Sequence, residues 1–120
     1  MEHEFSRLEI LIGKDKLDLL KSKRVAIFGI GGVGGAVCEA LARSGIGEFD
    51  LIDNDTVSLT NLNRQIIATY DSLNKDKVEA MKERNIPLGK ISILGTPCHK
   101  RYSSLYFLSS SLLVINIFLF

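Results

Sequence analysis

Apolar and charged positions alternate at helical spacing over residues 6–22, which predicts a helical segment. A break in this segment is expected at Gly13. Residues 24–28 form a short apolar run that ends at a glycine, a pattern typical of a buried strand. The apolar positions of the helical segment are Leu8, Leu11, Ile12, Leu17, Leu19 and Leu20.

A helix and a second strand are expected after the first strand. Residues 29–35 are rich in glycine, and residues 36–43 have the composition of a helix that stops at Ser44-Gly45. Residues 48–52 then read as a strand that ends on Asp53. Strand, helix and strand within about thirty residues predict a βαβ unit with parallel strands. A further, charged helix is expected over residues 75–84.

Composition narrows the class of protein only slightly. A chain of 120 residues suffices for one domain with a core. Its 15 Lys plus Arg nearly balance 14 Asp plus Glu, so net charge alone favours neither nucleic acid nor a membrane surface. A local patch that holds RNA stays open. Cys38 and Cys98 are too far apart in sequence to read as a metal-binding pair, and residues 1–7 lack the apolar run of a secretory signal, so a cytoplasmic location is expected.

The glycines carry the first candidate chemistry. Gly29, Gly31 and Gly34 form a G-x-G-x-x-G pattern between a predicted strand and a predicted helix. Such glycines turn the chain, let the backbone approach phosphate and let the helix pack on the strand. The helix that follows offers free N–H groups to an anion. Asp53, at the end of the second strand, suits the hydroxyls of a ribose. A turn needed only for packing and a strand-end cap are the alternatives.

The loop after Asp53 separates two kinds of nucleotide site. An NAD site needs an acid there and then an ordinary helix, whereas this loop is polar and contains amides and Arg64. A triphosphate site needs cations to neutralise the leaving pyrophosphate, and Arg64 and Lys77 could supply them. The alternative for Arg64 is a surface ion pair with Asp53 or Asp55. Lys77 lies in a charged helix, where chemistry alone predicts a solvated side chain.

Taken in order along the chain, these motifs resemble the ThiF/MoeB/HesA superfamily, the bacterial relatives of ubiquitin-activating enzymes. The resemblance covers about residues 7–84. The sequence of residues 42–47 and 60–66 is most similar to the tRNA threonylcarbamoyladenosine dehydratase branch. The motifs are Gly29-Ile-Gly31-Gly32-Val-Gly34, Asp53-x-Asp55, Asn61-x-x-Arg64-Gln65 and Lys77.

The resemblance implies an α/β fold, a Rossmann-like βαβ unit with a mostly parallel sheet, truncated after the nucleotide-binding half. It also implies ATP and Mg²⁺ as cofactors, adenylylation of a carboxylate as the reaction, tRNA as the substrate and a homodimer as the assembly. Gly29, Gly31, Gly32 and Gly34 would hold phosphate and adenosine, and Asp53 with Asp55 would complete the nucleotide site around the ribose. Asn61, Arg64 and Lys77 would face the phosphates, and Arg7 would reach the nucleotide of the partner subunit.

The chain departs from the superfamily after Arg84. Residues 1–84 are predicted to form the nucleotide-binding domain, and residues 85–120 an atypical hydrophobic tail without any Asp or Glu. The aspartate that binds magnesium in the superfamily has no counterpart, so this chain alone is expected to be inactive. A shifted reading frame or gene fragment is the preferred origin of the tail, which would leave a strand edge uncovered. A membrane anchor over residues 102–120 and a strand or helix that completes the sheet remain alternatives.

Four functions stay open. The first is cyclisation of threonylcarbamoyladenosine in tRNA by the complete protein. The second is activation of the C-terminus of a ubiquitin-like sulfur carrier. The third is a nucleotide-binding or dimer-interaction module without catalysis, and the fourth is an NAD-dependent oxidoreductase.

Overall fold

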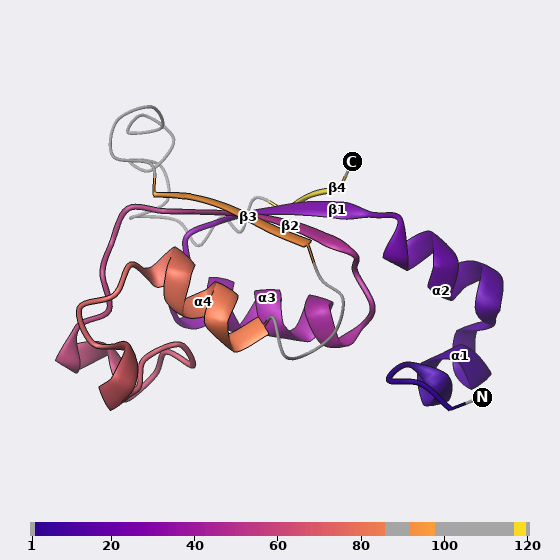
Figure 1. Ribbon diagram of the computed structural model, residues 1–120, viewed down its shortest axis with the longest axis horizontal. Helices are drawn as coiled ribbons and strands as arrows, with labels where there is room; N and C mark the ends of the chain where they lie inside the picture. Colours follow the sequence, from indigo (N-terminus) through magenta and orange to yellow (C-terminus); the bar gives the residue numbers. More distant parts are fainter. Residues whose placement is uncertain (1, 86–91, 98–116, 120) are drawn as a thin grey trace.

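A four-stranded sheet carries the fold of this chain. The computed structural model describes residues 2–85, 92–97 and 117–119 (Figure 1). Strands β1 (Arg24–Phe28) and β2 (Glu48–Asp53) pair in parallel, with Arg24 opposite Glu48 and Phe28 opposite Ile52. β3 (Ser92–Pro97) adds in parallel to β2, and β4 (Ile117–Leu119) adds antiparallel to β1. The order is β3-β2-β1-β4, so the predicted mostly parallel sheet is confirmed.

Two helices cover one face of this sheet. α3 (Gly32–Arg43) connects β1 to β2, and α4 (Lys77–Asn85) follows the long loop after β2. Both lie on the same side in Figure 1. Their buried side chains pack on those of β1 and β2 to form one core, which includes Val25, Ile27, Phe49, Leu51, Cys38, Ala42, Val78 and Met81. Phe49 and Leu51 alternate with half-buried neighbours, as expected for a strand with one face in the core.

Two helix starts differ from the sequence prediction. α3 begins at Gly32 and not at residue 36, because the last glycines of the motif form its first turns. α4 begins at Lys77 and not at residue 75, because the preceding residues are held in an extended bridge. Thr56 and Asp76 form this bridge, and the Val57 N–H donates to the carbonyl of Lys75. Tertiary pairing therefore overrides the helical composition at residues 75 and 76.

An ion-pair cluster fastens α4 to α3. The Glu39 carboxylate on α3 accepts hydrogen bonds from Arg84 on α4 and from Arg43 one turn further along α3. The hydrogen bond from Arg84, more than any other contact, lowers the pKa of Glu39. The charged face of α4 is thus partly used for packing and is not wholly solvated.

The two N-terminal helices lie beyond the amino-terminal end of β1 (Figure 1). α1 (Ser6–Ile12) and α2 (Lys14–Lys21) meet at Gly13, whose φ of +87° is strained for residues with a side chain. The predicted break is therefore confirmed. Leu17 is buried, but Leu11 is 80% exposed and Leu19 55% exposed, so the apolar stripe expected for residues 6–22 is only partly used as core.

Two segments of the C-terminal stretch complete the sheet on both sides. β3 pairs with the edge of β2 and β4 with that of β1, which matches the alternative of a strand that completes the sheet; β3 and β4 are then the edge strands of the described sheet. Pairing satisfies backbone N–H and C=O groups that an edge would expose. Among the described residues no helix has the length and apolarity to cross a bilayer. The anchor interpretation of residues 102–120 concerns mostly positions outside the described ranges.

Cys38 lies on α3, and its side chain is enclosed where α3 faces α4. Its side chain is fully buried, and Asn85 Nδ2 donates to Cys38 Sγ at 3.1 Å. Burial raises the pKa of this thiol to about 12, so it stays protonated at neutral pH. A protonated, enclosed thiol is a poor nucleophile. Cys38 therefore has a packing role in the core and not a catalytic one.

This assignment predicts the reactivity of the thiol. In a Cys98→Ser variant, Cys38 should resist a thiol reagent at pH 8 in the native protein and react completely after denaturation, because only the exposed thiolate attacks. Absorbance of the released thiolate measures the reaction. A Cys38→Ser variant reports Cys98 separately. Complete modification of Cys38 in the folded protein within seconds would contradict its burial.

Candidate nucleotide site

The glycine turn links β1 to α3 at the carboxyl end of β1. Gly29 has a φ of +90°, and its N–H donates to the carbonyl of Ile52 at the end of β2, 2.8 Å away. Gly34 touches this turn so closely that a Cβ atom on it would lie 1.8 Å from the carbonyl oxygen of Gly29. Gly31 is the N-cap of α3, so the free N–H groups of a twelve-residue helix open onto the turn. Turn and helix have the backbone geometry that the glycine pattern predicts, and the binding of phosphate there stays a prediction.

Asp53 ties the end of β2 to this turn. It is 6% exposed, and its two carboxylate oxygens accept separate backbone hydrogen bonds: Oδ2 from the Ile30 N–H at 2.5 Å and Oδ1 from the Asp55 N–H at 2.8 Å. Each oxygen retains a further lone pair for a ligand hydroxyl. Asp53 therefore holds the glycine turn, a structural role close to the strand-end cap named as its alternative, and ribose binding stays a prediction.

Lys77 is buried, so the prediction of a solvated side chain is wrong. Only 9% of its side chain is exposed, and its Nζ lies 3.4 Å from Asp55 Oδ2. The extended bridge explains this position, because the Lys77 N–H donates to the carbonyl of Asp55 and brings the start of α4 to the loop after β2. This buried ammonium is paired with a carboxylate that is 66% exposed.

Asn61 holds the loop in its present form. It lies in the short 3-10 helix η1 (Leu59–Asn61), is buried, and accepts the Ser58 N–H through Oδ1 at 2.9 Å. Its carbonyl accepts the N–H groups of Arg64 and Gln65. The side chain thus forms a capping box, which fixes the turn that presents Arg64.

Arg64 is exposed and makes only local contacts. Its Nη1 donates to the carbonyl of Thr60 at 2.8 Å and to Asn63 Oδ1 at 3.0 Å. The alternative of an ion pair with Asp53 or Asp55 does not occur among the described residues. Its other guanidinium N–H groups have no partner in the described part of the chain, so they are free for a ligand. The Arg64 carbonyl lies 3.6 Å from where a Cβ of Gly32 would be, which places this turn over the start of α3.

Gln65 was missed as an individual site residue. It is 8% exposed, its Oε1 is enclosed without a hydrogen-bond partner, and its Nε2 lies 3.8 Å from where a Cβ of Gly31 would be. The sequence could have pointed to it only as the neighbour of Arg64 in the motif. Its burial depends on how the loop folds back over α3.

Arg7 does not join the other candidates. It is exposed on α1, which lies beyond the amino-terminal end of β1, whereas the glycine turn and Asp53 lie at the carboxyl ends of the strands (Figure 1). Within one copy of the chain it therefore has no part in the site. The role expected from a partner subunit stays a prediction.

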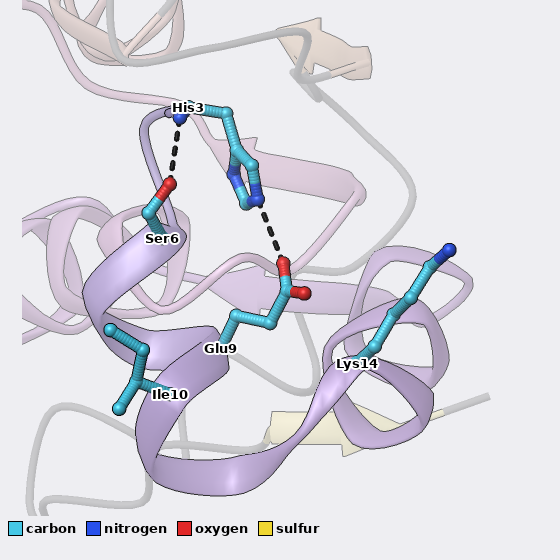
Figure 2. Close-up of a pocket in the computed structure, with 5 residues that line it drawn as sticks. All are labelled: His3, Ser6, Glu9, Ile10 and Lys14. Atoms are coloured by element: carbon cyan, nitrogen blue, oxygen red, sulfur yellow. Dashed lines mark hydrogen bonds and ion pairs between the residues drawn. The ribbon is translucent and has the colours of Figure 1, made fainter. Parts of the chain in front are cut away.

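A separate pocket of about 320 Å³ lies beside α1 (Figure 2). His3 Nε2 is 2.8 Å from Glu9 Oε2, while the Ser6 hydroxyl accepts the main-chain N–H of His3 at 2.7 Å. Because Ser6 faces the backbone and not the imidazole ring, these side chains form no nucleophilic pair. Their hydrogen bonds instead fix the entry into α1.

Carboxylates and imidazoles do not gather into a metal site in the described residues. No group of three or more His, Cys, Asp or Glu side chains there could hold a metal ion. Asp53 and Asp55 are the carboxylates next to the glycine turn, and each already has a partner.

The described geometry defines a class of protein. A glycine turn leads into a helix N-terminus at the carboxyl end of a parallel strand, and the acid at the end of the next strand binds that turn, as in nucleotide-binding domains of the doubly wound α/β class. The model of the ThiF family matches residues 5–86. The chain belongs to the ThiF family.

Known relatives agree with this membership. A tRNA threonylcarbamoyladenosine dehydratase of Bacillus subtilis is 50% identical over 84 residues, which are 70% of this chain and 33% of the relative. A molybdopterin-synthase adenylyltransferase of Haemophilus influenzae is 44% identical over 68 residues, 57% of this chain and 28% of that protein. The chain spans about a third of the length of such curated relatives.

A solved structure supports the same fold. The E. coli tRNA N6-threonylcarbamoyladenosine dehydratase TcdA, in complex with ATP, superposes with a TM-score of 0.79 and 35% identity over 89% of this chain and 44% of that chain. The Rossmann-like α/β fold expected from the sequence is therefore confirmed.

Proposed function

We propose that this chain provides the ATP-binding half of an adenylating enzyme. The observation that carries the proposal is the Asp53 carboxylate, which holds the glycine turn through the Ile30 N–H at the N-terminus of α3. An acid and a glycine turn alone would also suit NAD. The residues after Asp53 favour ATP, because they add two cations: Arg64, whose guanidinium keeps N–H groups without a partner among the described residues, and Lys77, whose Nζ lies 3.4 Å from Asp55 Oδ2.

The reaction that suits these groups is attack of a carboxylate oxygen on the α-phosphorus of ATP. The new bond forms an acyl adenylate, and the bond between the α-phosphorus and the bridging oxygen breaks to release pyrophosphate. Arg64 would bind the leaving pyrophosphate with its planar fork of donors, and Lys77 would neutralise charge as a point cation. Mg²⁺ is the ion expected to accompany the triphosphate, and we assign it no residue of the described chain.

We further propose that the complete protein acts on the carboxyl group of threonylcarbamoyladenosine in tRNA, where ring closure would expel AMP. The 50% identity to the Bacillus subtilis dehydratase supports this substrate. Activation of a sulfur-carrier C-terminus is the second candidate, supported by the 44% identity to the molybdopterin-synthase adenylyltransferase. A homodimer, in which Arg7 reaches the nucleotide of the other copy, belongs to the same proposal.

Isothermal titration of the chain with ATP, NAD and adenosine tests the proposal, together with an assay for AMP and pyrophosphate. ATP binding in preference to NAD is expected. Binding without formation of AMP or pyrophosphate would indicate a nucleotide-binding module without catalysis. A preference for NAD would contradict the proposed site.

Arg64→Ala provides the residue-level test. We expect ATP affinity to fall about 10- to 100-fold, because charge-assisted hydrogen bonds to phosphate are lost. Adenosine affinity should stay unchanged, and so should the melting temperature, because Arg64 is exposed. Arg64→Lys keeps the positive charge but not the planar set of donors, so its ATP affinity should lie between those of the wild type and Arg64→Ala. Equal loss of ATP and adenosine affinity would show that the turn is only structural.

A further inference from the structure

Asn74 has a backbone conformation that residues with a side chain rarely adopt. Its φ is +67°, and it is the one non-glycine residue with a positive φ in the part of the chain that the structure describes. Its side chain is exposed, so packing of the side chain does not impose this conformation. The reason must lie in what the backbone does at this position.

Residues 72–75 form a type II β-turn. The Lys75 N–H donates to the carbonyl of Ser72 at 3.1 Å, which closes the turn. Leu73, its second residue, has φ −54° and ψ 135°, and Asn74 follows with its positive φ. A type II turn requires a positive φ at the third residue, where Gly and Asn are therefore preferred. Asn74 thus meets a demand of the turn.

The turn leads into a short pairing of two extended segments. The Asn74 N–H donates to the carbonyl of Val57 at 2.9 Å, and the Val57 N–H donates to the carbonyl of Lys75 at 2.8 Å. Thr56 and Asp76 form the bridge that follows. Because the Val57 side chain is buried in the core, one of the two segments is anchored, and the turn fixes the register of the other.

The pairing ends at Lys77, the first residue of α4. The Lys77 N–H donates to the carbonyl of Asp55 at 3.0 Å, and its Nζ lies 3.4 Å from Asp55 Oδ2. A slip of one residue in an extended pairing turns each side chain to the opposite face. Such a slip would carry the ammonium of Lys77 away from Asp55. The turn three residues earlier therefore determines where this buried cation lies.

We propose that Asn74 is a positioning residue of the nucleotide site, whose left-handed conformation sets the register that places the ammonium of Lys77 beside Asp55. The inference rests on the proposed ATP-binding function, in which Lys77 neutralises charge on the triphosphate. Asn74 itself is exposed and acts through the backbone.

Asn74→Val and Asn74→Gly form a matched pair, because both replace the same exposed side chain and differ in whether a positive φ is tolerated. For Asn74→Val we expect the melting temperature to fall by about 4 °C or more. Its ATP affinity, measured by isothermal titration, should fall about tenfold, since the phosphates lose a charged partner. Adenosine has no phosphate and should bind with unchanged affinity. Asn74→Gly should match the wild type in both affinities.

A double-mutant cycle with Lys77→Met tests whether Asn74 acts through the lysine. Met keeps an unbranched apolar stem without the charge, so ATP affinity of Lys77→Met should already be lowered about tenfold. Adding Asn74→Val to Lys77→Met should then lower it no further, because two changes that remove one interaction are not additive. A second full loss in the double variant would overturn the role of Asn74 as a positioning residue for Lys77.

Asn74→Ala, whose side chain is smaller and not branched, decides the question if the valine variant does not fold. ATP affinity equal to that of the wild type in a folded Val or Ala variant would overturn the proposal. Equal losses of ATP and adenosine affinity would overturn it too, because they would identify a turn that matters only for stability.

The wild-type titration separates this inference from the proposed function. If the wild type prefers ATP and the variants at position 74 bind it equally well, the role of Asn74 is wrong and the proposed function stands. If the wild type binds neither ATP nor adenosine, the proposed function is wrong, and the positioning role is overturned with it.

Discussion

Replacing Gly34 with alanine is expected to lower the free energy of unfolding by at least about 3 kcal/mol. The added methyl group would lie 1.8 Å from the carbonyl oxygen of Gly29, and backbone cannot swing away as a flexible side chain can. Relief requires α3 to move off β1, which breaks the contacts of Ile27 and Cys38 in the core. For a domain of this size the melting temperature should drop by about 12 °C or more.

Gly35→Ala is the matched control, because it lies next to Gly34 in the same helix. Its Cβ would meet Ile66 at 3.5 Å, an ordinary van der Waals contact. Since alanine favours a helix over glycine by about 1 kcal/mol, this variant should be as stable as the wild type or more stable. Differential scanning calorimetry of both variants decides the matter. A melting temperature of Gly34→Ala within two or three degrees of wild type, which corresponds to about 0.5 kcal/mol, would contradict the close packing of turn and helix.

Replacing Asp53 with alanine should damage stability and nucleotide binding together. The buried N–H of Ile30 and the N–H of Asp55 would both lose a charged acceptor, at a cost of about 2–4 kcal/mol. Without this acceptor the glycine turn is no longer fixed and the ribose loses its carboxylate, so ATP affinity should fall at least about tenfold. Urea unfolding and isothermal titration measure the two effects.

Asp53→Asn and Asp50→Asn complete this series. Asn at position 53 keeps one acceptor but turns an NH₂ group against the second backbone N–H, so its loss of stability should be intermediate. Asp50 lies on the same strand and pairs with the side chain of Arg24 at 2.8 Å, away from the glycine turn. Asp50→Asn should therefore leave ATP affinity unchanged. Full ATP affinity in Asp53→Ala would exclude Asp53 from the site.

Local sequence patterns predicted the part of the fold that depends on neighbouring residues. The break at Gly13, the strand over residues 24–28 and the strand that ends on Asp53 all follow from periodicity and glycine placement. The glycine pattern also placed the turn at the start of α3. The helix boundaries at residues 36 and 75 were less accurate, because the glycines enter the helix and Asp76 pairs with Thr56.

The sequence by itself thus determined the βαβ unit, the glycine turn and the acid at the end of β2, because each depends on spacing within one short segment. Only the tertiary structure decided how the residues of the site are used. Lys77 is buried because α4 docks against the loop after β2. Asp53 accepts one hydrogen bond from the Ile30 N–H of the glycine turn and one from the Asp55 N–H, and Gln65 is buried where the segment around it lies against α3. Burial and hydrogen-bond partners depend on residues distant in the chain, which composition and periodicity do not encode.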